Sequence, residues 1–168
     1  MISAAPYEFP WDQLVTRFKY QQQVDLGRPL AEVMARAVRQ AHPNGVDIDR
    51  VLPVPLAGER LAHRGFNQAW ELARHLGRML RLPAHATLLQ RTVAAAPQAS
   101  LSRAQRLSQL QGVFAVPPKA RALLRGQRLA LVDDVMTTGA TARAAAQVLR
   151  AAGAAQVEVW TLARTDVG

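Results

Sequence analysis

Residues 129–141 of this 168-residue chain read LALVDDVMTTGAT. The segment opens with a short apolar run, 129–132, which predicts a strand buried on both faces of a parallel sheet. Asp133 and Asp134 end that run, at the carboxyl edge where open α/β sheets bind ligands. Small and hydroxyl-bearing residues follow and lead into the Ala-rich stretch 142–152, which predicts a helix. The pattern therefore predicts an α/β fold with a ligand site at the end of this strand.

The loop between the acids and the helix has the chemistry of a phosphate cradle. Free backbone N–H groups at a helix start and the helix dipole favour an anion, and threonine hydroxyls add donors. Gly139 has no Cβ, so a phosphate can approach the backbone closely. Adjacent carboxylates suit this place if they accept hydrogen bonds from sugar hydroxyls or face Mg²⁺ through water. The combination predicts a ribose 5-phosphate ligand. The alternative is a solvated acid pair before a threonine-capped helix.

An apolar strand, two acids and a T-T-G-x-T loop resemble the 5-phosphoribosyl 1-pyrophosphate (PRPP) motif of the type I phosphoribosyltransferases. The resemblance implies a type I phosphoribosyltransferase-like fold, in which helices flank a parallel sheet. It also implies that PRPP is the substrate and that Asp133 and Asp134 are the catalytic carboxylates. The implied PRPP-binding residues are Val132, Asp133, Asp134, Val135, Met136, Thr137, Thr138, Gly139, Ala140 and Thr141.

Length and composition narrow the class of protein. The sequence has no run of 18 apolar residues, so we expect no membrane span, and its first residues lack the features of a signal peptide. It has no cysteine, which excludes disulfides and a cysteine zinc site and favours a cytoplasmic location. We expect one domain over 1–168, with an N-terminal helical segment at 1–45 and a ligand-binding α/β core at 46–168.

The net charge of +9 is concentrated in the middle of the chain. Residues 56–128 carry 12 basic residues and two acidic ones, whereas the rest of the chain is nearly neutral. This distribution suits a polyphosphate ligand, a nucleic acid, or both. An arginine-rich composition without a role in binding is the alternative.

Local patterns predict the other elements. Apolar residues at helical spacing indicate helices within 5–20 and at 29–41 and 66–81, and short apolar runs indicate strands at 50–55, 86–89, 112–116 and 157–162. The segments 56–67 and 117–126 are predicted as connections. The long polar stretch 91–111 is typical of a flexible segment beside a site.

Segment 56–67 reads LAGERLAHRGFN and directly follows the predicted strand 50–55. Arginines near a glycine loop at the carboxyl end of a strand fit bidentate phosphate recognition. An ordinary basic loop between a strand and a helix is the alternative. Asn67 is in position to cap the helix that follows.

The order of motifs extends the resemblance over nearly the whole chain: FKY, PVPLAGERLAHRGFNQAWELA, LLQRT, GVF, LVDDVMTTGAT and TLART. It is similar to the ComF family of competence-associated proteins with a phosphoribosyltransferase domain. Family members usually begin with a four-cysteine zinc module, which this sequence does not contain. By this resemblance the pyrophosphate loop includes Pro55, Leu56, Arg60 and Arg64, and further candidates are Lys19, Asn67, Gln68, Arg103 and Arg106.

The resemblance implies a protein that binds PRPP and Mg²⁺ and is linked to competence and DNA uptake. The Mg²⁺ would be held through PRPP, and through water at Asp133 or Asp134. The implied reaction transfers the 5-phosphoribosyl group to a base or amine with release of pyrophosphate. The alternative is a non-catalytic PRPP- or nucleotide-binding protein that binds single-stranded DNA in natural transformation. Competence-machinery proteins are further candidate partners, and the sequence leaves the oligomeric state and the acceptor open.

Overall fold

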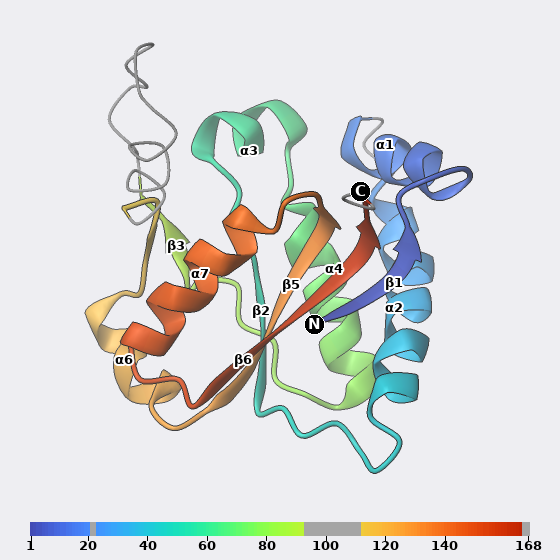
Figure 1. The fold of residues 1–168 in the computed structure, drawn as a ribbon. Helices are drawn as coiled ribbons and strands as arrows, with labels where there is room; N and C mark the ends of the chain where they lie inside the picture. The colour runs from blue at the N-terminus through green and yellow to red at the C-terminus, as the bar shows by residue number, and fades with distance from the viewer. Residues whose placement is uncertain (21–22, 93–111, 166–168) are drawn as a thin grey trace.

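The computed structural model describes residues 1–20, 23–92 and 112–165 (Figure 1). Its elements are β1 (Ile2–Pro6), α1 (Trp11–Tyr20), the 3₁₀ turn η1 (Val24–Leu26), α2 (Gly27–Ala41), β2 (Arg50–Pro53), α3 (Gly58–Arg64), α4 (Gln68–Leu80), β3 (Gln90–Arg91), β4 (Phe114–Ala115), α6 (Pro118–Leu124), β5 (Arg128–Met136), α7 (Ala140–Ala151) and β6 (Gln156–Arg164). In the described part of the chain, no helix combines the length and the hydropathy needed to cross a membrane.

Four strands form one parallel sheet in the order β1-β6-β5-β2. The central strand β5 pairs with β6 from Arg128, opposite Gln156, to Met136, opposite Arg164. Its other neighbour, β2, ends opposite Val132. Because all pairs are parallel, the carboxyl ends of the strands meet at one edge of the sheet, at the top of Figure 1. The predicted parallel α/β sheet flanked by helices is confirmed.

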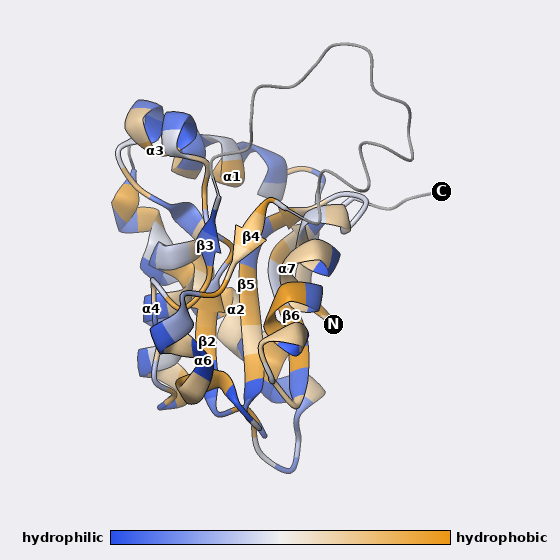
Figure 2. Cartoon of the chain, turned by 90° about the vertical axis from the view of Figure 1, so that its left-hand side faces the viewer, coloured by the Kyte–Doolittle hydropathy of each residue, from blue (hydrophilic) through white to orange (hydrophobic). Residues whose placement is uncertain are grey.

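Side chains of β5 alternate between two hydrophobic clusters, one on each face of the sheet. Leu129 and Leu131 pack with α6 and α7, whereas Ala130 and Val132 pack with α1, α2 and α4. In Figure 1, α6 and α7 lie in front of the sheet, and α2 and α4 lie behind it. Figure 2 shows the strands as a largely apolar layer between helices with polar outer faces. These four side chains are fully buried, which confirms a strand covered on both faces.

The strand β5 is longer than its apolar run predicts. It continues to Met136, so Asp133 and Asp134 lie within the strand and not after it. The reason is that β6 keeps pairing with β5 beyond Val132 and holds the backbone extended. Since β2 has ended by this point, the last part of β5 has a neighbour on one side only.

The N-terminal segment 1–45 is not wholly helical, so that prediction was wrong. Its first residues form β1, an edge strand parallel to β6, with Ile2 opposite Trp160. The helix α1 begins only at Trp11, and α2 has Pro29 in its first turn, as predicted. Five small and apolar residues carry little strand signal of their own, and pairing with β6 decides their conformation.

Two predicted connections and two predicted strands also differ from the structure. Segment 56–67 contains α3, and segment 117–126 contains α6, where a proline at the first helical position favours a helix start. Residues 86–89, predicted as a strand, form bends, and the short strand β3 begins only after them, at Gln90. The strand predicted at 112–116 is reduced to β4, which pairs with β3 in a separate antiparallel sheet. Of the predicted flexible segment, residues 93–111 lie outside the described residues.

Gly77, near the end of α4, allows the chain to turn back closely toward β2. The Leu82 amide donates to the Gly77 carbonyl over 2.8 Å, and a Cβ on Gly77 would lie 2.7 Å from the Leu82 carbonyl oxygen. We expect Gly77→Ala to lower the free energy of unfolding by about 1–3 kcal/mol, because backbone atoms must move apart. Thermal unfolding followed by circular dichroism measures this change.

Gly58→Ala in α3 is the matched control. Nothing lies within 4 Å of a Cβ added at Gly58, so the usual benefit of alanine in a helix applies, and the melting temperature should stay the same or rise slightly. Equal melting temperatures for Gly77→Ala and the parent chain would contradict the packing argument.

Candidate functional site

A pocket of about 280 Å³ lies at the carboxyl edge of the sheet. Its walls come from the end of α1, from the segment between β2 and the first turn of α4, from β3, and from β5 with the start of α7. Because β2 and β5 are neighbours, the two loops predicted to bind phosphates face each other. The lining residues are Lys19, Val54, Pro55, Leu56, Arg60, Arg64, Asn67, Gln68, Ala69, Arg91, Asp133, Asp134, Val135 and Thr141.

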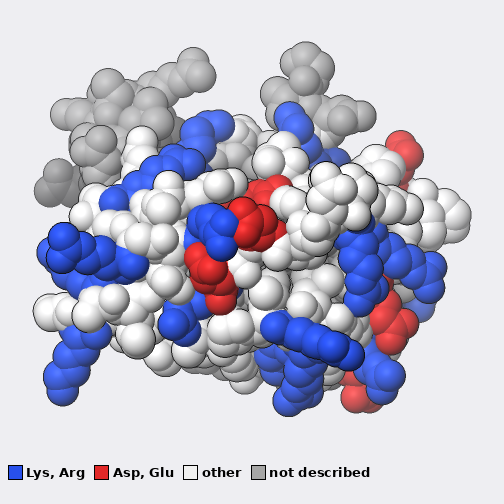
Figure 3. Space-filling view, turned by 90° about the horizontal axis from the view of Figure 1, so that it is seen from below, with Lys and Arg blue, Asp and Glu red and all other residues white. Residues whose placement is uncertain are grey.

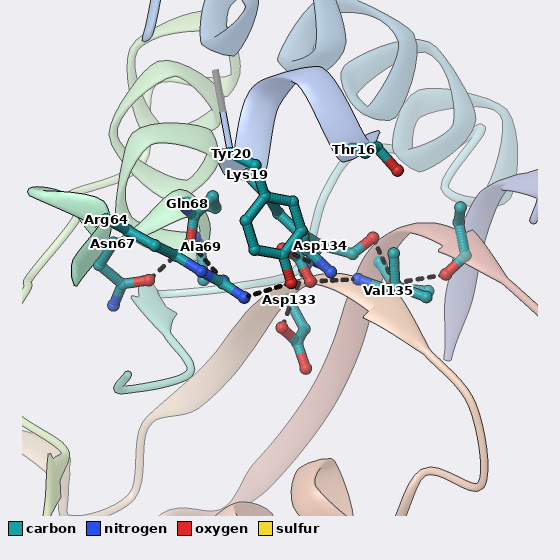
Figure 4. Close-up of polar contacts among 12 residues, drawn as sticks. Thr16, Lys19, Tyr20, Arg64, Asn67, Gln68, Ala69, Asp133, Asp134 and Val135 are labelled. Carbon is teal, nitrogen blue, oxygen red and sulfur yellow. Dashed lines mark hydrogen bonds and ion pairs between the residues drawn. The ribbon is translucent and has the colours of Figure 1, made fainter. Parts of the chain in front are cut away.

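Asp133 and Asp134 form the acidic wall of this pocket (Figure 4). Each accepts a hydrogen bond from the next amide: the Asp134 N–H donates to Asp133 Oδ1 over 2.9 Å, and the Val135 N–H donates to Asp134 Oδ1 over 2.6 Å. Burial and the neighbouring Asp134 charge raise the pKa of Asp133 to about 7, although the Asp134 amide and Lys19 act against this. A carboxyl group perturbed in this way inside a cleft is a candidate for function.

Lys19 supplies the cation closest to this acid pair. Its Nζ lies 3.2 Å from Asp134 Oδ2, and both side chains are largely buried. Lys19 belongs to the last turn of α1, so the N-terminal segment contributes directly to the pocket. Resemblance alone suggested this residue, because a single lysine beside an apolar stripe is usually a solvated charge. Its role in ligand binding stays a prediction.

Arg64, at the end of α3, faces the acids from the opposite wall. It donates to Gln68 Oε1 over 3.1 Å and to the Tyr20 hydroxyl over 3.2 Å. Its guanidinium carbon lies 4.9 Å from the centroid of the Tyr20 ring. Figure 4 shows Tyr20 and Arg64 meeting in front of Asp133 and Asp134. These contacts connect α3 to the end of α1.

Asn67 and Gln68 hold the start of α4 against the pocket. Asn67 caps this helix by accepting a hydrogen bond from the Ala69 amide over 3.0 Å, as predicted, and its Nδ2 donates to the Val54 carbonyl over 3.2 Å. Gln68 is buried, and its Nε2 has no hydrogen-bond partner among the described residues. A buried amide without a partner is costly, so Gln68 is a candidate donor to a ligand.

The loop between β5 and α7 has two sides. Gly139 has φ +70°, a backbone conformation that favours glycine, and a Cβ there would lie 3.3 Å from the Met136 sulfur, which would have to shift slightly. Thr141, in the first turn of α7, lines the pocket with the acids. Thr137 and Thr138 line a separate groove on the other side of the loop. The predicted PRPP residues are therefore divided between two hollows.

Some predicted site residues lie elsewhere. The Val132 side chain is fully buried against α1, α2 and α4 and does not face the pocket. Its carbonyl accepts a hydrogen bond from the Val54 amide over 2.8 Å, which ties the two strand ends together. Arg103 and Arg106 lie outside the described residues, so their part in the site stays a prediction.

Arg91 lines the pocket, although the sequence did not single it out. Burial, and then the charge of nearby Arg60, lower its pKa. Its guanidinium carbon also lies 5.6 Å from the centroid of the Phe114 ring. The sequence offered one signal that could have identified Arg91: it is a basic residue two positions after the strand predicted at 86–89. An anion held between Arg60 and Arg91 would relieve the repulsion between them.

Comparison with known proteins identifies the family of this chain. The model of the family "Phosphoribosyl transferase domain" matches residues 61–167. Competence protein F of Haemophilus influenzae is 35% identical over 167 residues, which cover 98% of this chain and 72% of that protein. The chain belongs to the ComF family.

Other ComF relatives and solved structures agree with this assignment. DNA utilization protein YhgH of Escherichia coli K12 is 33% identical over 167 residues, covering 98% of this chain and 72% of that protein. An adenine phosphoribosyltransferase superposes with a TM-score of 0.57 at 16% identity, covering 88% of this chain and 74% of that one. The glutamine PRPP amidotransferase of B. subtilis gives a TM-score of 0.54 at 20% identity, covering 79% and 25%. These structures show the type I phosphoribosyltransferase fold.

Replacing Asp133 tests the strain in the acid pair. A raised pKa means that the folded chain resists ionisation, so stability falls as the pH rises from the ordinary value of 3.8 to about 7. We expect Asp133→Asn to leave the melting temperature unchanged near pH 4 and to raise it by about 4–8 °C at pH 8. This rise corresponds to about 2 kcal/mol, after allowance for solvent at the partly buried carboxylate. Calorimetric melting across this pH range measures it.

Asp49→Asn is the control with the opposite sign. Hydrogen bonds from Arg128 lower the pKa of Asp49, so this carboxylate stabilises the folded chain above its ordinary pKa of 3.8. The Asp49 variant should melt lower at pH 7, with a difference that shrinks as the pH falls below 3.8. A gain at pH 8 for both variants would point to a general charge effect instead of strain at Asp133.

Proposed function

We propose that this ComF protein binds PRPP with Mg²⁺ and transfers its 5-phosphoribosyl group to a base or amine, releasing pyrophosphate. One observation carries the proposal: a single pocket holds two adjacent carboxylates on one wall and the guanidinium groups of Arg60, Arg64 and Arg91 around the other. This pocket lies at the carboxyl edge of a parallel sheet, where α/β proteins bind ligands.

The parts of PRPP match different parts of the pocket. Asp133 and Asp134 would accept hydrogen bonds from the ribose hydroxyls. The start of α7 would hold the 5-phosphate, because helix N-termini favour anions. Arg60, Arg64 and Arg91 would hold the pyrophosphate, since guanidinium groups bind phosphate oxygens in pairs.

Asp133 and Asp134 could also bind a Mg²⁺ ion that enters the pocket together with PRPP. No group of three or more His, Cys, Asp or Glu side chains that could hold a metal occurs among the described residues. Mg²⁺ commonly binds through one or two carboxylates together with water and substrate phosphates, which fits Asp133 and Asp134 beside a pyrophosphate. Bound there, Mg²⁺ would stabilise the negative charge of the leaving pyrophosphate.

The protein side chains would stabilise the two charges that separate in the reaction. As the bond from the ribosyl carbon to pyrophosphate breaks, positive charge develops on the ribose next to Asp133 and Asp134. Arg60 and Arg64 lie where they could stabilise the departing pyrophosphate. Lys19 pairs with Asp134 before the ligand binds, so binding would require this ion pair to open or to be shared with a phosphate.

Calorimetric titration with PRPP, with and without Mg²⁺, tests the proposal. We expect saturable binding that Mg²⁺ strengthens. Asp133→Asn and Asp134→Asn should each weaken it at least tenfold, because each removes a charged hydrogen-bond acceptor worth about 1.5–3 kcal/mol. Asp25→Asn is the matched control, since Asp25 is exposed and lies outside the pocket. Parent-like binding by both pocket variants would refute the assignment.

Arg91 provides a second test, independent of the acids. We expect Arg91→Gln to weaken binding of PRPP roughly tenfold and of ribose 5-phosphate much less, because only the pyrophosphate is expected to meet this side chain. The exposed residue Arg78 supplies the control Arg78→Gln. An equal loss for both ligands would assign Arg91 to another part of the pocket. Release of pyrophosphate with a panel of nucleobases, ammonia and amino acids would then identify the acceptor.

Binding of single-stranded DNA without turnover is the second candidate function. The name DNA utilization protein, carried by relatives that are 33% identical to this chain, favours it. Competence-machinery proteins would then be further partners. We place either activity in the cytoplasm, since a chain without cysteine is typical of a reducing compartment.

A further inference from the structure

Two neighbouring side chains hold the guanidinium group of Arg64 in one place. Its Nη1 donates to Gln68 Oε1 over 3.1 Å, and its Nη2 donates to the Tyr20 hydroxyl over 3.2 Å. Gln68 is buried at the start of α4, whereas Tyr20 is the last residue of α1. Arg64 is therefore fixed from two different helices, one on each side of it.

Both partners of Arg64 are neutral, which distinguishes it from arginines that pair with carboxylates. Figure 3 shows the end of the molecule opposite the pocket, where basic and acidic side chains lie next to each other. At the start of β5, Arg128 pairs with Asp47 and Asp49, which offset its charge. Arg64, by contrast, has an amide and a phenol as partners and forms no salt bridge within the described residues. It is held in position while its positive charge remains available to an anion.

The ring of Tyr20 adds a third contact. The guanidinium carbon of Arg64 lies 4.9 Å from the ring centroid, within the range at which a cation is attracted to an aromatic face. Tyr20 is 60% exposed, so burial in the core does not account for its position. A guanidinium group has five N–H donors, and the two hydrogen bonds to Gln68 and Tyr20 leave three of them for phosphate oxygens.

The last turn of α1 has a fixed place at the pocket because the helix is anchored behind it. Phe18 is fully buried, and its ring centroid lies 5.7 Å from that of Phe66, in the segment between α3 and α4. Lys19, from the same turn, pairs with Asp134 on the acidic wall. Figure 4 shows Tyr20 in front of the acids, with its hydroxyl toward the arginine. One helical turn thus contacts both walls of the pocket.

We propose that Tyr20 is a positioning residue that holds the Arg64 guanidinium for the pyrophosphate of the ligand and thereby sets the preference of the pocket for PRPP over ribose 5-phosphate. A side chain that is ordered before the ligand arrives loses less conformational freedom on binding. Because the tyrosine is neutral, this ordering does not compete with the phosphate oxygens for the charge. The inference rests on the proposed binding of PRPP and adds a residue outside its motif.

Calorimetric titration with PRPP and with ribose 5-phosphate, each with Mg²⁺, tests the role of Tyr20. Tyr20→Phe keeps the ring and removes the hydroxyl, so it should weaken PRPP binding about threefold, whereas Tyr20→Ala removes both contacts and should weaken it about tenfold. Both variants should bind ribose 5-phosphate as the parent chain does. Phe9→Ala is the matched control, because Phe9 is an exposed aromatic residue of the same segment outside the pocket.

A double-mutant cycle tests whether Tyr20 acts through Arg64. Arg64→Gln should itself weaken PRPP binding at least tenfold, and the addition of Tyr20→Ala should cause no further loss, because the group that Tyr20 positions is gone. A further tenfold loss in the double variant would indicate direct contact between Tyr20 and the ligand and would overturn the inference. Melting temperatures of the Tyr20 variants should stay close to that of the parent chain, since the side chain is exposed.

The possible outcomes separate this inference from the proposed function. If the parent chain binds PRPP and the Tyr20→Ala variant binds it equally well, the role of Tyr20 is wrong and the proposed function stands. An equal loss of PRPP and ribose 5-phosphate binding would also refute it, because Tyr20 would then support the whole pocket and not the arginine. If the parent chain does not bind PRPP in the presence of Mg²⁺, the proposed function fails and the inference fails with it.

Discussion

Two adjacent carboxylates held at the end of the central strand are the constraint on which the site depends. β6 continues beside β5 and keeps its backbone extended through Asp133 and Asp134, whereas β2 has already ended. The side that β2 leaves open becomes the pocket. Two like charges so close together are costly, and the raised pKa of Asp133 expresses that cost. Lys19, with its Nζ 3.2 Å from Asp134 Oδ2, offsets part of that cost.

The N-terminal segment contributes both to the sheet and to the pocket with the acid pair. β1 extends the sheet beyond β6, and α1 packs Val15 and Phe18 into the cluster behind it. That packing brings Lys19 to Asp134 and Tyr20 to Arg64. The stability of the fold and the charge balance of the pocket thus depend on the same helix.

The loop between β5 and α7 borders two hollows at the carboxyl edge of the sheet. Thr141 faces the acids and the arginines of the pocket, whereas Thr137 and Thr138 face the groove lined by Arg143 and Arg150. Arg60, Arg64 and Arg91, which line the pocket, all come from the basic middle of the chain.

The sequence by itself determined the features that are contiguous along the chain. The apolar run 129–132, the acid pair, Gly139 and the Ala-rich helix were predictable because each depends on neighbouring residues, and Asn67 was recognisable as a helix cap for the same reason. Tertiary structure alone decided the existence of β1, the full length of β5, the Lys19–Asp134 contact and the place of Arg91 in the pocket. These features depend on pairing and packing between distant segments, which local periodicity does not encode.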